Sequence, residues 1–285
     1  MQAEEPLEEL VRRAAEGSRE ALDAVVRAVQ DDIYGLALRM LWHPHDAADA
    51  AQEILIKIVT HLGSFRGESR FRTWCFRVAS NHLVGVRASR AERRAPSFEE
   101  LSERFASAAV PLEPAADAGE GPEARLLEQE VKLSCTLGLL LCLDRPHRLA
   151  FIVGDVLGLP GDEAAEVVGV AGPAYRKRLS RARERLRGFL SEHCGIVDPD
   201  APCRCSRRAG PAVASGQIVP TRLLFARHPE RSPDARALFA KARELEELHA
   251  TVQLYRSHPD YGAPESVARA VRELLALRGP SVLAD

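Results

Sequence analysis

Residues 66–77, RGESRFRTWCFR, combine dense positive charge with aromatic side chains. Arginines bind the phosphates of melted DNA and aromatic rings stack on its unpaired bases, so this combination is typical of a single-strand binder. A pocket that captures an extruded base also offsets part of the cost of unstacking. We expect Phe71 to be exposed, whereas Trp74 suits either a base-binding surface or the packing of a helical bundle. The predicted contacts are Arg66, Arg70, Phe71, Trp74, Arg77 and Asn81.

Residues 159–190 have the pattern of a helix-turn-helix. Gly169 suits the turn, while Gly172 and Pro173 suit the N-cap and the first position of a second helix. Arginine and lysine pair with guanine edges in the major groove, and neighbouring basic groups bind phosphates. A basic helix that only improves solubility is the alternative. The predicted contacts with duplex DNA are Arg176, Lys177, Ser180 and Arg181.

A third group of reactive side chains lies within thirteen positions and consists of His193, Cys194, Cys203 and Cys205. Thiolate and imidazole ligands in fours suit zinc or another soft metal ion, although the spacing is not that of a standard zinc finger. A redox disulfide and a set of inert thiols remain open as alternatives. Cys135 and Cys142 lie on apolar runs, and we interpret them as core thiols without a chemical role.

The distribution of charge separates these segments. The chain has 285 residues, enough for two or three domains, and its formal net charge of −2 excludes no class of partner. Residues 63–94 contain eight arginines and two glutamates, and residues 172–190 contain seven basic residues and one glutamate. Between these basic blocks, residues 91–122 are rich in acidic residues, alanine and proline, which predicts a flexible linker.

The elements that position these groups are predicted to be helices. Apolar residues recur at helical spacing along most of the chain and alternating strand patterns are nearly absent, which predicts an all-α fold. Residues 7–29 predict two helices divided at Gly17-Ser18, and a separate helix over 31–42 is predicted to begin at two aspartates. Residues 233–256 and 264–278 also have helical periodicity.

A helix that begins at Asp46 has two distinct faces. Its predicted buried stripe consists of Ala51, Leu55, Ile58, Val59 and Leu62. Its polar side carries Asp49, Gln52 and Glu53, which form either a solvated face or a binding surface. No apolar run of about 18 residues could span a membrane, and the acidic start MQAEEPLEELVRR does not resemble a secretory signal, so we expect a cytoplasmic protein.

The sequence DAADAAQEILIKIV followed by FRGESRFRTWCFRVASNHLVGVRAS closely resembles conserved region 2 of bacterial extracytoplasmic-function sigma factors. The resemblance implies that Asp49, Gln52 and Glu53 dock on the basic clamp helices of core RNA polymerase, as complementary charge favours. It also implies that residues 64–81 bind the non-template strand of the −10 element and hold a flipped base.

Residues 159–190 resemble region 4 of the same family, which reads the −35 element, and the resemblance as a whole covers residues 7–192. The family usually has Ser or Thr at the positions of Pro160 and Ala171, and Gly-Thr at the positions of Pro173 and Ala174, so a promoter preference cannot be transferred. The predicted domains are region 2 at 1–90, the acidic linker at 91–122, region 4 at 123–192 and a C-terminal extension at 193–285.

The resemblance implies a non-catalytic initiation factor that binds core polymerase and promoter DNA, with an anti-sigma protein as a possible further partner. An extension tethered beside these domains has a high effective concentration, and Cys-rich tails that respond to metals occur in some members of the family, so the extension is a candidate regulator. No cofactor is required, but zinc or another soft metal is expected at the Cys cluster.

Two other classes of function stay open. A helix-turn-helix regulator that does not bind polymerase would not need the acidic helix followed by RGESRFRTW. A metal or redox sensor, or a thiol enzyme, would use the Cys cluster. An enzyme is disfavoured because the sequence has no phosphate-binding loop, no pair of catalytic carboxylates and no nucleophile with a convincing base.

Overall fold

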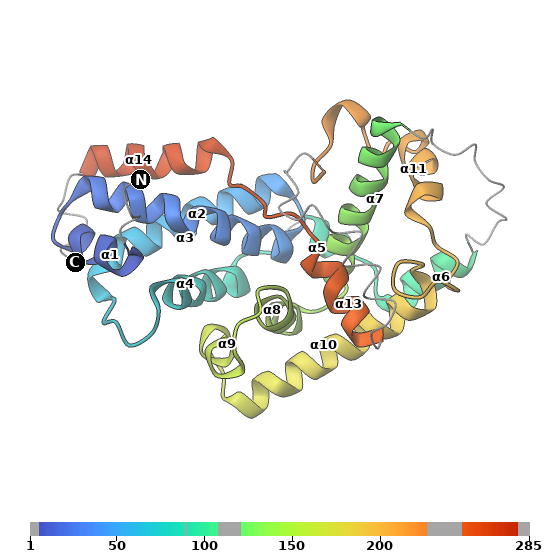
Figure 1. Cartoon of the computed structure of the whole chain (residues 1–285), viewed down its shortest axis with the longest axis horizontal. Helices are drawn as coiled ribbons and strands as arrows, with labels where there is room; N and C mark the ends of the chain where they lie inside the picture. Colours follow the sequence, from blue (N-terminus) through green and yellow to red (C-terminus); the bar gives the residue numbers. More distant parts are fainter. Residues whose placement is uncertain (1–5, 89, 108–120, 227–246, 279–285) are drawn as a thin grey trace. The chain divides into compact units, whose positions relative to one another are not determined.

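The computed structural model describes residues 6–88, 90–107, 121–226 and 247–278, and in these ranges all regular elements are helices. The predicted all-α fold is therefore confirmed. The one extended pairing in the described ranges is an isolated bridge between Cys194 and Cys203. None of the described helices is long and apolar enough to cross a membrane. The chain divides into two compact units (Figure 1).

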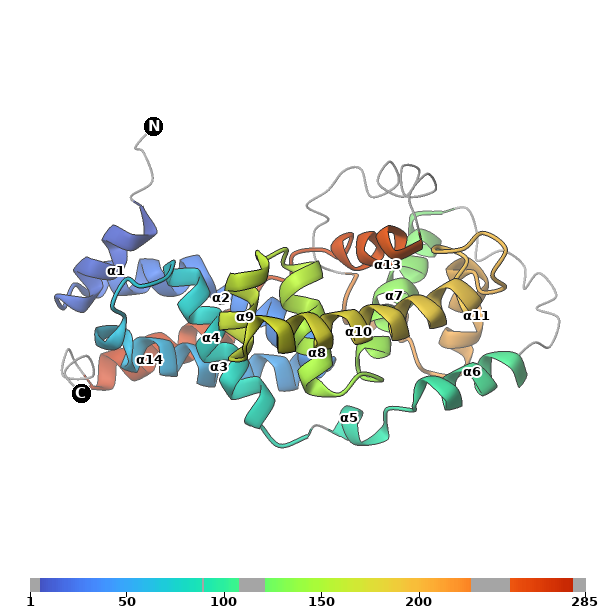
Figure 2. The same cartoon turned by 90° about the horizontal axis from the view of Figure 1, so that it is seen from below.

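Unit 1 contains residues 1–89, 159–175 and 261–285. Its helices are α1 (Leu7–Ala15), α2 (Arg19–Leu41), α3 (Pro44–Thr60), α4 (Phe71–Gly85), α9 (Gly161–Val168) and α14 (Glu265–Arg278), with a 3-10 turn at Leu62–Ser64. Helix α2 packs against α1, α3 and α4, and α9 packs against α4 (Figure 2). The predicted buried stripe of α3, from Ala51 to Leu62, lies in the core of this unit.

The beginning of unit 1 follows the sequence signals except at one place. The break at Gly17-Ser18 is confirmed, and the Ser18 side chain caps α2 by accepting a hydrogen bond from the Ala21 amide at 3.3 Å. The separate helix predicted for residues 31–42 is wrong, because α2 continues to Leu41. Val29 and Ile33 belong to one buried face, so packing extends the helix through Asp31 and Asp32.

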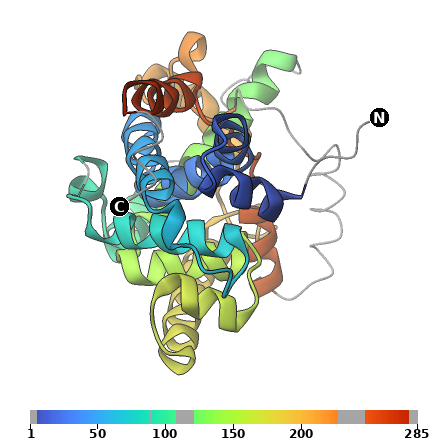
Figure 3. The ribbon, with the colours of Figure 1, turned by 90° about the vertical axis from the view of Figure 1, so that its left-hand side faces the viewer.

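Helix α14, although far from α1–α4 in the sequence, belongs to unit 1. Seen end-on in Figure 3, the dark red α14 lies beside the blue helices α2 and α3, and it packs on both. Its contribution is apolar, through Val267, Ala268 and Val271. Tyr261 lies shortly before α14 in the sequence, and the Arg39 guanidinium on α2 lies 4.9 Å from the centre of its ring. The extension is therefore part of the same core as the predicted region 2 helices.

Unit 2 contains residues 90–158 and 176–260. Its elements are α5 (Arg90–Arg94), α6 (Phe98–Ser107), α7 (Pro122–Leu140), α8 (Arg145–Phe151), a π-helical turn at Ile152–Val156, the greater part of α10 (Gly172–His193), α11 (Cys205–Ala214), a 3-10 turn at Pro220–Arg222 and α13 (Glu247–Arg256). Helix α11 packs on α7, and α13 packs on the π-helical turn. Of the helix predicted over 233–256, residues 233–246 lie outside the described residues.

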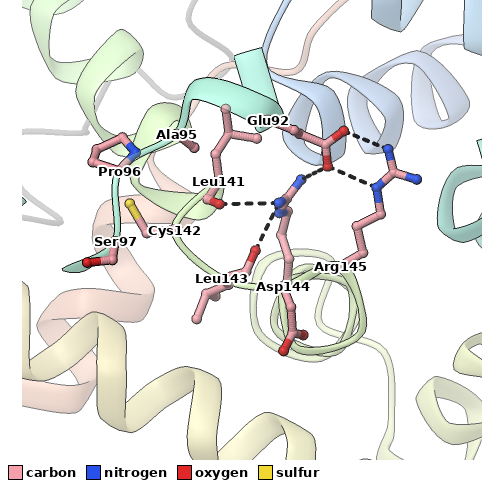
Figure 4. A pocket seen from close by; sticks show the side chains of 10 residues that line it. Glu92, Ala95, Pro96, Ser97, Leu141, Cys142, Leu143, Asp144 and Arg145 are labelled. Atoms are coloured by element: carbon pink, nitrogen blue, oxygen red, sulfur yellow. Dashed lines mark hydrogen bonds and ion pairs between the residues drawn. The ribbon is translucent and has the colours of Figure 1, made fainter. Parts of the chain in front are cut away.

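The segment predicted as a flexible linker is partly helical, since α5 and α6 lie within it. The Glu92 carboxylate accepts hydrogen bonds from Arg145 and Arg148 at 2.6 and 2.9 Å, beside a cavity of about 370 Å³ (Figure 4). The Phe98 ring lies 5.9 Å from that of Phe189. A paired carboxylate and a buried ring fix residues 90–107 on unit 2, which composition alone does not reveal. Residues 108–120 lie outside the described residues.

The extension also packs within unit 2. The buried Glu130 carboxylate on α7 accepts hydrogen bonds from the amides of Leu224, Phe225 and Ala226 at 2.7–3.0 Å. The Arg256 guanidinium donates to the Asp155 carbonyl at 2.5 Å. The described residues of the segment 193–285 are thus distributed over the two units.

Candidate nucleic-acid interface

Helix α4 carries the side chains predicted to bind melted DNA. It buries Phe71, Cys75, Phe76, Ala79 and Leu83. This stripe leaves the opposite side of α4 and the segment before it to the polar residues. Arg66, Arg70, Arg77 and Asn81 are all exposed. Three cations on one surface provide the phosphate-binding component of a single-strand site.

Of the two aromatic side chains predicted to contact DNA, Phe71 lies in a different position from the one expected. Phe71 is fully buried, so the prediction that it is exposed is wrong. Its ring stacks on Trp74 with centres 5.6 Å apart, and Phe65 packs edge-on against it at 5.2 Å. Phe71 belongs to the buried face of α4, which packs against α2 and α3. Trp74 is half-buried and retains accessible surface.

Acidic residues of α9 contact this basic surface. The Arg70 guanidinium donates to both carboxylate oxygens of Glu163 at 2.6 Å, and the Thr73 hydroxyl donates to the same group at 3.2 Å. The hydrogen bond that Arg70 donates to Glu163, followed by the charge of Glu163, raises the pKa of Arg70. Arg77 forms a longer ion pair with Glu166 at 3.7 Å. Two of the predicted DNA-binding arginines are therefore paired with carboxylates of α9.

Helix α3 presents the residues predicted to dock on polymerase. Asp49 and Glu53 are exposed and Gln52 is half-buried. Asp49 pairs with His45 at 3.0 Å, and Glu53 lies 3.6 Å from Nε2 of His82. The Lys57 ammonium donates to Nδ1 of His82 at 2.8 Å. Burial, and then the charge of Lys57, lower the pKa of His82, while Glu53 opposes this effect. The exposed carboxylates suit a basic partner.

The turn before α10 lies at Gly169 as predicted, but Gly172 is the first residue of α10 and not its N-cap. Gly169 ends α9 with φ of 72°, a left-handed conformation that favours glycine, and α10 begins at Gly172. Tyr175 is buried, whereas Arg176, Lys177, Ser180 and Arg181 are exposed. The side chains predicted to read duplex DNA are thus presented along one accessible stretch of α10.

The predicted metal ligands separate into two groups. Nε2 of His193 lies 2.9 Å from the Ser102 hydroxyl, and its ring packs on Phe189 with centres 4.6 Å apart. Cys194 and Cys203 face each other across the isolated bridge, and Cys205 begins α11. Among the described residues, no three His, Cys, Asp or Glu side chains are close enough together to hold a metal ion as they stand. The metal site remains a prediction.

Sequence reasoning missed three participants. Glu163 and Glu166 were not assigned a role, because their spacing on α9 is equally typical of a solvated helix face. Cys135 is exposed and not a core thiol as predicted, and it lies on α7, against which α11, beginning at Cys205, packs. No pattern in the sequence near Cys135 indicates that its helix packs on the one that begins at Cys205.

Comparison with known proteins agrees with this arrangement. The family model "Sigma-70 region 2" matches residues 25–94. The RNA polymerase sigma-H factor of Pseudomonas aeruginosa is 31% identical over 192 residues, which cover 65% of this chain and 94% of that protein. The ECF RNA polymerase sigma factor SigW of Bacillus subtilis is 26% identical over 184 residues, 64% of this chain and 95% of that protein.

The ECF RNA polymerase sigma-E factor of Escherichia coli K12 is 29% identical over 180 residues, which cover 62% of this chain and 90% of that protein. These relatives match across almost their whole length, and the family model covers α3 and α4, where the acidic and basic surfaces lie. The chain therefore belongs to the extracytoplasmic-function sigma factors of bacterial RNA polymerase.

Proposed function

We propose that this sigma factor docks on core polymerase through Asp49, Gln52 and Glu53, reads duplex DNA of the −35 element through α10, and captures the melted −10 strand on α4. Sigma factors are non-enzymatic initiation factors that bind core RNA polymerase and promoter DNA. The observation that carries the assignment of sites is the exposure of opposite charges on neighbouring helices of one unit. Helix α3 presents carboxylates, while α4 presents Arg77 and Asn81 and the segment before it presents Arg66.

The proposed contacts on α4 and α10 differ in the form of DNA that they suit. Helix α4 combines cations with the half-buried Trp74, which suits a phosphate backbone with an unstacked base. Helix α10 presents a basic stretch without aromatic rings, which suits a major groove. Capture of a flipped base on α4 would favour the open promoter, so that this surface aids melting.

We also propose that the extension regulates initiation. Its support is that Val267 and Val271 of α14 pack on α2 and α3, while the amides of residues 224–226 bind Glu130 on α7. A change of state in the extension therefore acts directly on helices of both predicted sigma regions. A soft metal ion at the Cys cluster is the proposed signal, and a separate anti-sigma protein is a further possible partner.

The test is run-off transcription by core polymerase on a panel of host promoters, with full-length protein and point variants. Truncation is avoided because the extension contributes to both cores. Glu53→Lys is expected to abolish specific transcripts but to leave −35 duplex binding intact. Lys177→Ala is expected to weaken binding to every −35 duplex tested by about 1 kcal/mol or more. It is also expected to reduce the dependence of that binding on salt concentration.

Two results would contradict the assignment. If full-length protein binds duplex DNA but yields no specific transcript from any promoter, the sites belong to a plain helix-turn-helix regulator. If Lys57→Glu, which changes charge one turn from Glu53, weakens polymerase binding as much as Glu53→Lys does, the specific acidic contact is absent. The regulatory part fails separately, if a metal chelator leaves the transcript yield of the full-length protein unchanged.

A further inference from the structure

Helix α13 of the extension is anchored on unit 2 at two points. The Tyr255 ring packs edge-on against Phe151 of α8 with centres 5.1 Å apart, and both rings are buried. Just after α13, Nε2 of His258 lies 2.8 Å from the Thr136 hydroxyl on α7. These contacts hold α13 against the π-helical turn at Ile152–Val156, on which it packs.

The π-helical turn is closed by a residue of α13. The Leu157 amide donates to the Ile152 carbonyl at 2.8 Å, five residues back, and Gly158 follows with a left-handed φ of 70°. Turns of this kind are rare and often lie at functional sites. The last carbonyls of a helix have no partner within it, and here the Arg256 guanidinium donates to the Asp155 carbonyl at 2.5 Å. Arg256 therefore caps the π-helical turn from another helix, at an end where a cation also suits the helix dipole.

The side chain of Asp155 makes a second, separate contact. Its buried carboxylate accepts two hydrogen bonds from the Arg183 guanidinium on α10, from Nε at 2.8 Å and from Nη2 at 2.6 Å. Such a two-point contact fixes orientation as well as distance. Asp155 thus contacts α13 through its main chain and α10 through its side chain.

Arg183 lies on the side of α10 that is proposed to read DNA. It comes three positions after Ser180 and seven after Arg176, so the three residues lie on successive turns of the same side of the helix. The neighbouring side of α10 is buried through Ala182 and Leu186. The contact with Asp155 therefore helps to set the rotation of α10 about its axis, and with it the direction in which Arg176 and Ser180 project.

Reading bases demands more exact positioning than binding phosphates. Hydrogen bonds to base edges weaken steeply with distance and angle, so a small rotation of the reading helix removes them. Long basic side chains still reach phosphates after such a rotation, and these contacts carry no sequence information. A residue that only positions α10 should therefore influence the preference for one sequence more than the general attraction to DNA.

We propose that Arg256 is a positioning residue for the recognition of duplex DNA. It holds the turn at Asp155, and the Asp155 carboxylate holds Arg183 and the reading side of α10. Helix α13 of the extension is then a part of the module that reads DNA, and its contribution is to increase sequence preference. The inference rests on the proposed reading of the −35 duplex by α10.

The experiment measures binding of full-length variants to two duplexes by fluorescence anisotropy over a range of salt concentrations. One duplex carries the −35 element of the host promoter that gives the strongest run-off transcript, and the other has the same bases in scrambled order. Arg256→Ala is expected to weaken binding to the −35 duplex about three- to tenfold and to leave binding to the scrambled duplex unchanged. Its salt dependence should remain that of the wild type. Lys177→Ala should instead weaken binding to both duplexes and reduce the slope of log affinity against log salt by about 1.

Three further variants separate positioning from other roles. Arg222→Ala removes an exposed cation elsewhere in the part of the extension that belongs to unit 2, and it should behave as the wild type. Arg256→Lys keeps a charged donor for the carbonyl and should recover most of the sequence preference. In an Asp155→Asn background, Arg256→Ala should cause little further loss, because both changes act through the contact with Arg183.

Circular dichroism checks the fold of each variant, and Arg256→Gln takes the place of Arg256→Ala if the alanine variant is unfolded. Unchanged affinity of the Arg256 variant for the −35 duplex would overturn the inference. An equal loss on both duplexes with a reduced salt slope would do the same, because it identifies a phosphate contact, as would a fully additive loss in the Asp155→Asn background. A wild-type protein without preference for the −35 duplex would refute the proposed reading of DNA by α10, and the inference with it.

Discussion

At the scale of single residues, His82 of α4 contacts two charged residues of α3, Lys57 and Glu53. Its side chain is only 7% exposed, and it accepts a hydrogen bond from Lys57 while facing Glu53. Burial and Lys57 keep the imidazole neutral by lowering its pKa. A proton on this ring would alter the charge directly beneath the proposed polymerase-docking carboxylates.

The pH dependence of stability follows from this shift. The folded chain has a lowered His82 pKa, so on acidification the unfolded chain binds the proton first, below about pH 6.5. Stability contributed by neutral His82 is therefore present above that pH and is lost as the pH falls through it. We expect the thermal midpoint of wild-type protein to decrease more steeply between neutral and mildly acidic pH than that of His82→Gln. Parallel profiles of the two proteins would contradict this.

A second prediction concerns Glu163, whose carboxylate neutralises Arg70. Glu163→Gln is expected to increase the affinity for a single-stranded −10 oligonucleotide about two- to fivefold, because an exposed ion pair is worth up to about 1 kcal/mol. The control is Asp162→Asn, which removes the same charge from an exposed neighbour. Fluorescence anisotropy at fixed ionic strength measures both, and equal gains in the two variants would show a general charge effect.

At the scale of elements, one buried carboxylate connects the extension to α7. Glu130 is 3% exposed and accepts three backbone hydrogen bonds from residues 224–226. Hydrogen bonds to a charged group are stronger than neutral ones, and three amides left without a partner would be costly. This contact determines where the segment between α11 and α13 lies.

Glu130→Ala is accordingly expected to destabilise unit 2 by about 3 kcal/mol or more. Glu128→Ala, an exposed neighbour on the same helix, should change stability by less than about 0.5 kcal/mol. Chemical unfolding gives the free energies, and limited proteolysis near Arg222 reports on the detached segment. A Glu130 variant as stable and as resistant as the Glu128 variant would show that the three hydrogen bonds contribute little.

At the scale of the whole molecule, α14 completes a core that α2 and α3 form much earlier in the chain. Val271 of α14 is fully buried against α2 and α3. Val271→Asp is expected to lower the free energy of unfolding by about 3 kcal/mol or to undock α14, because it buries an unpaired charge. Arg272→Asp on the exposed side is the control, and hydrogen exchange of α3 amides reports the change. Unchanged protection of α3 in the Val271 variant would mean that α14 does not stabilise this core.

The sequence by itself determined the helical class, the family resemblance and two exposed sets, Asp49 with Glu53 and Arg176 with Lys177, Ser180 and Arg181. These properties depend on local periodicity, on turn residues such as Gly169 and on charge, all of which neighbours in the sequence encode. The helix boundary at Gly17-Ser18 was predictable for the same reason, whereas α3 begins at Pro44, two residues before the predicted start at Asp46, and ends at Thr60.

Only the tertiary structure decided which partners these residues find. It buried Phe71, continued α2 through Asp31 and Asp32, and placed α5 and α6 in the segment predicted as a linker. It also paired Glu163 with Arg70 and packed α11, which begins at Cys205, on α7, which carries Cys135. Each of these relations depends on packing between segments distant in the chain, and a local pattern carries no information about that packing.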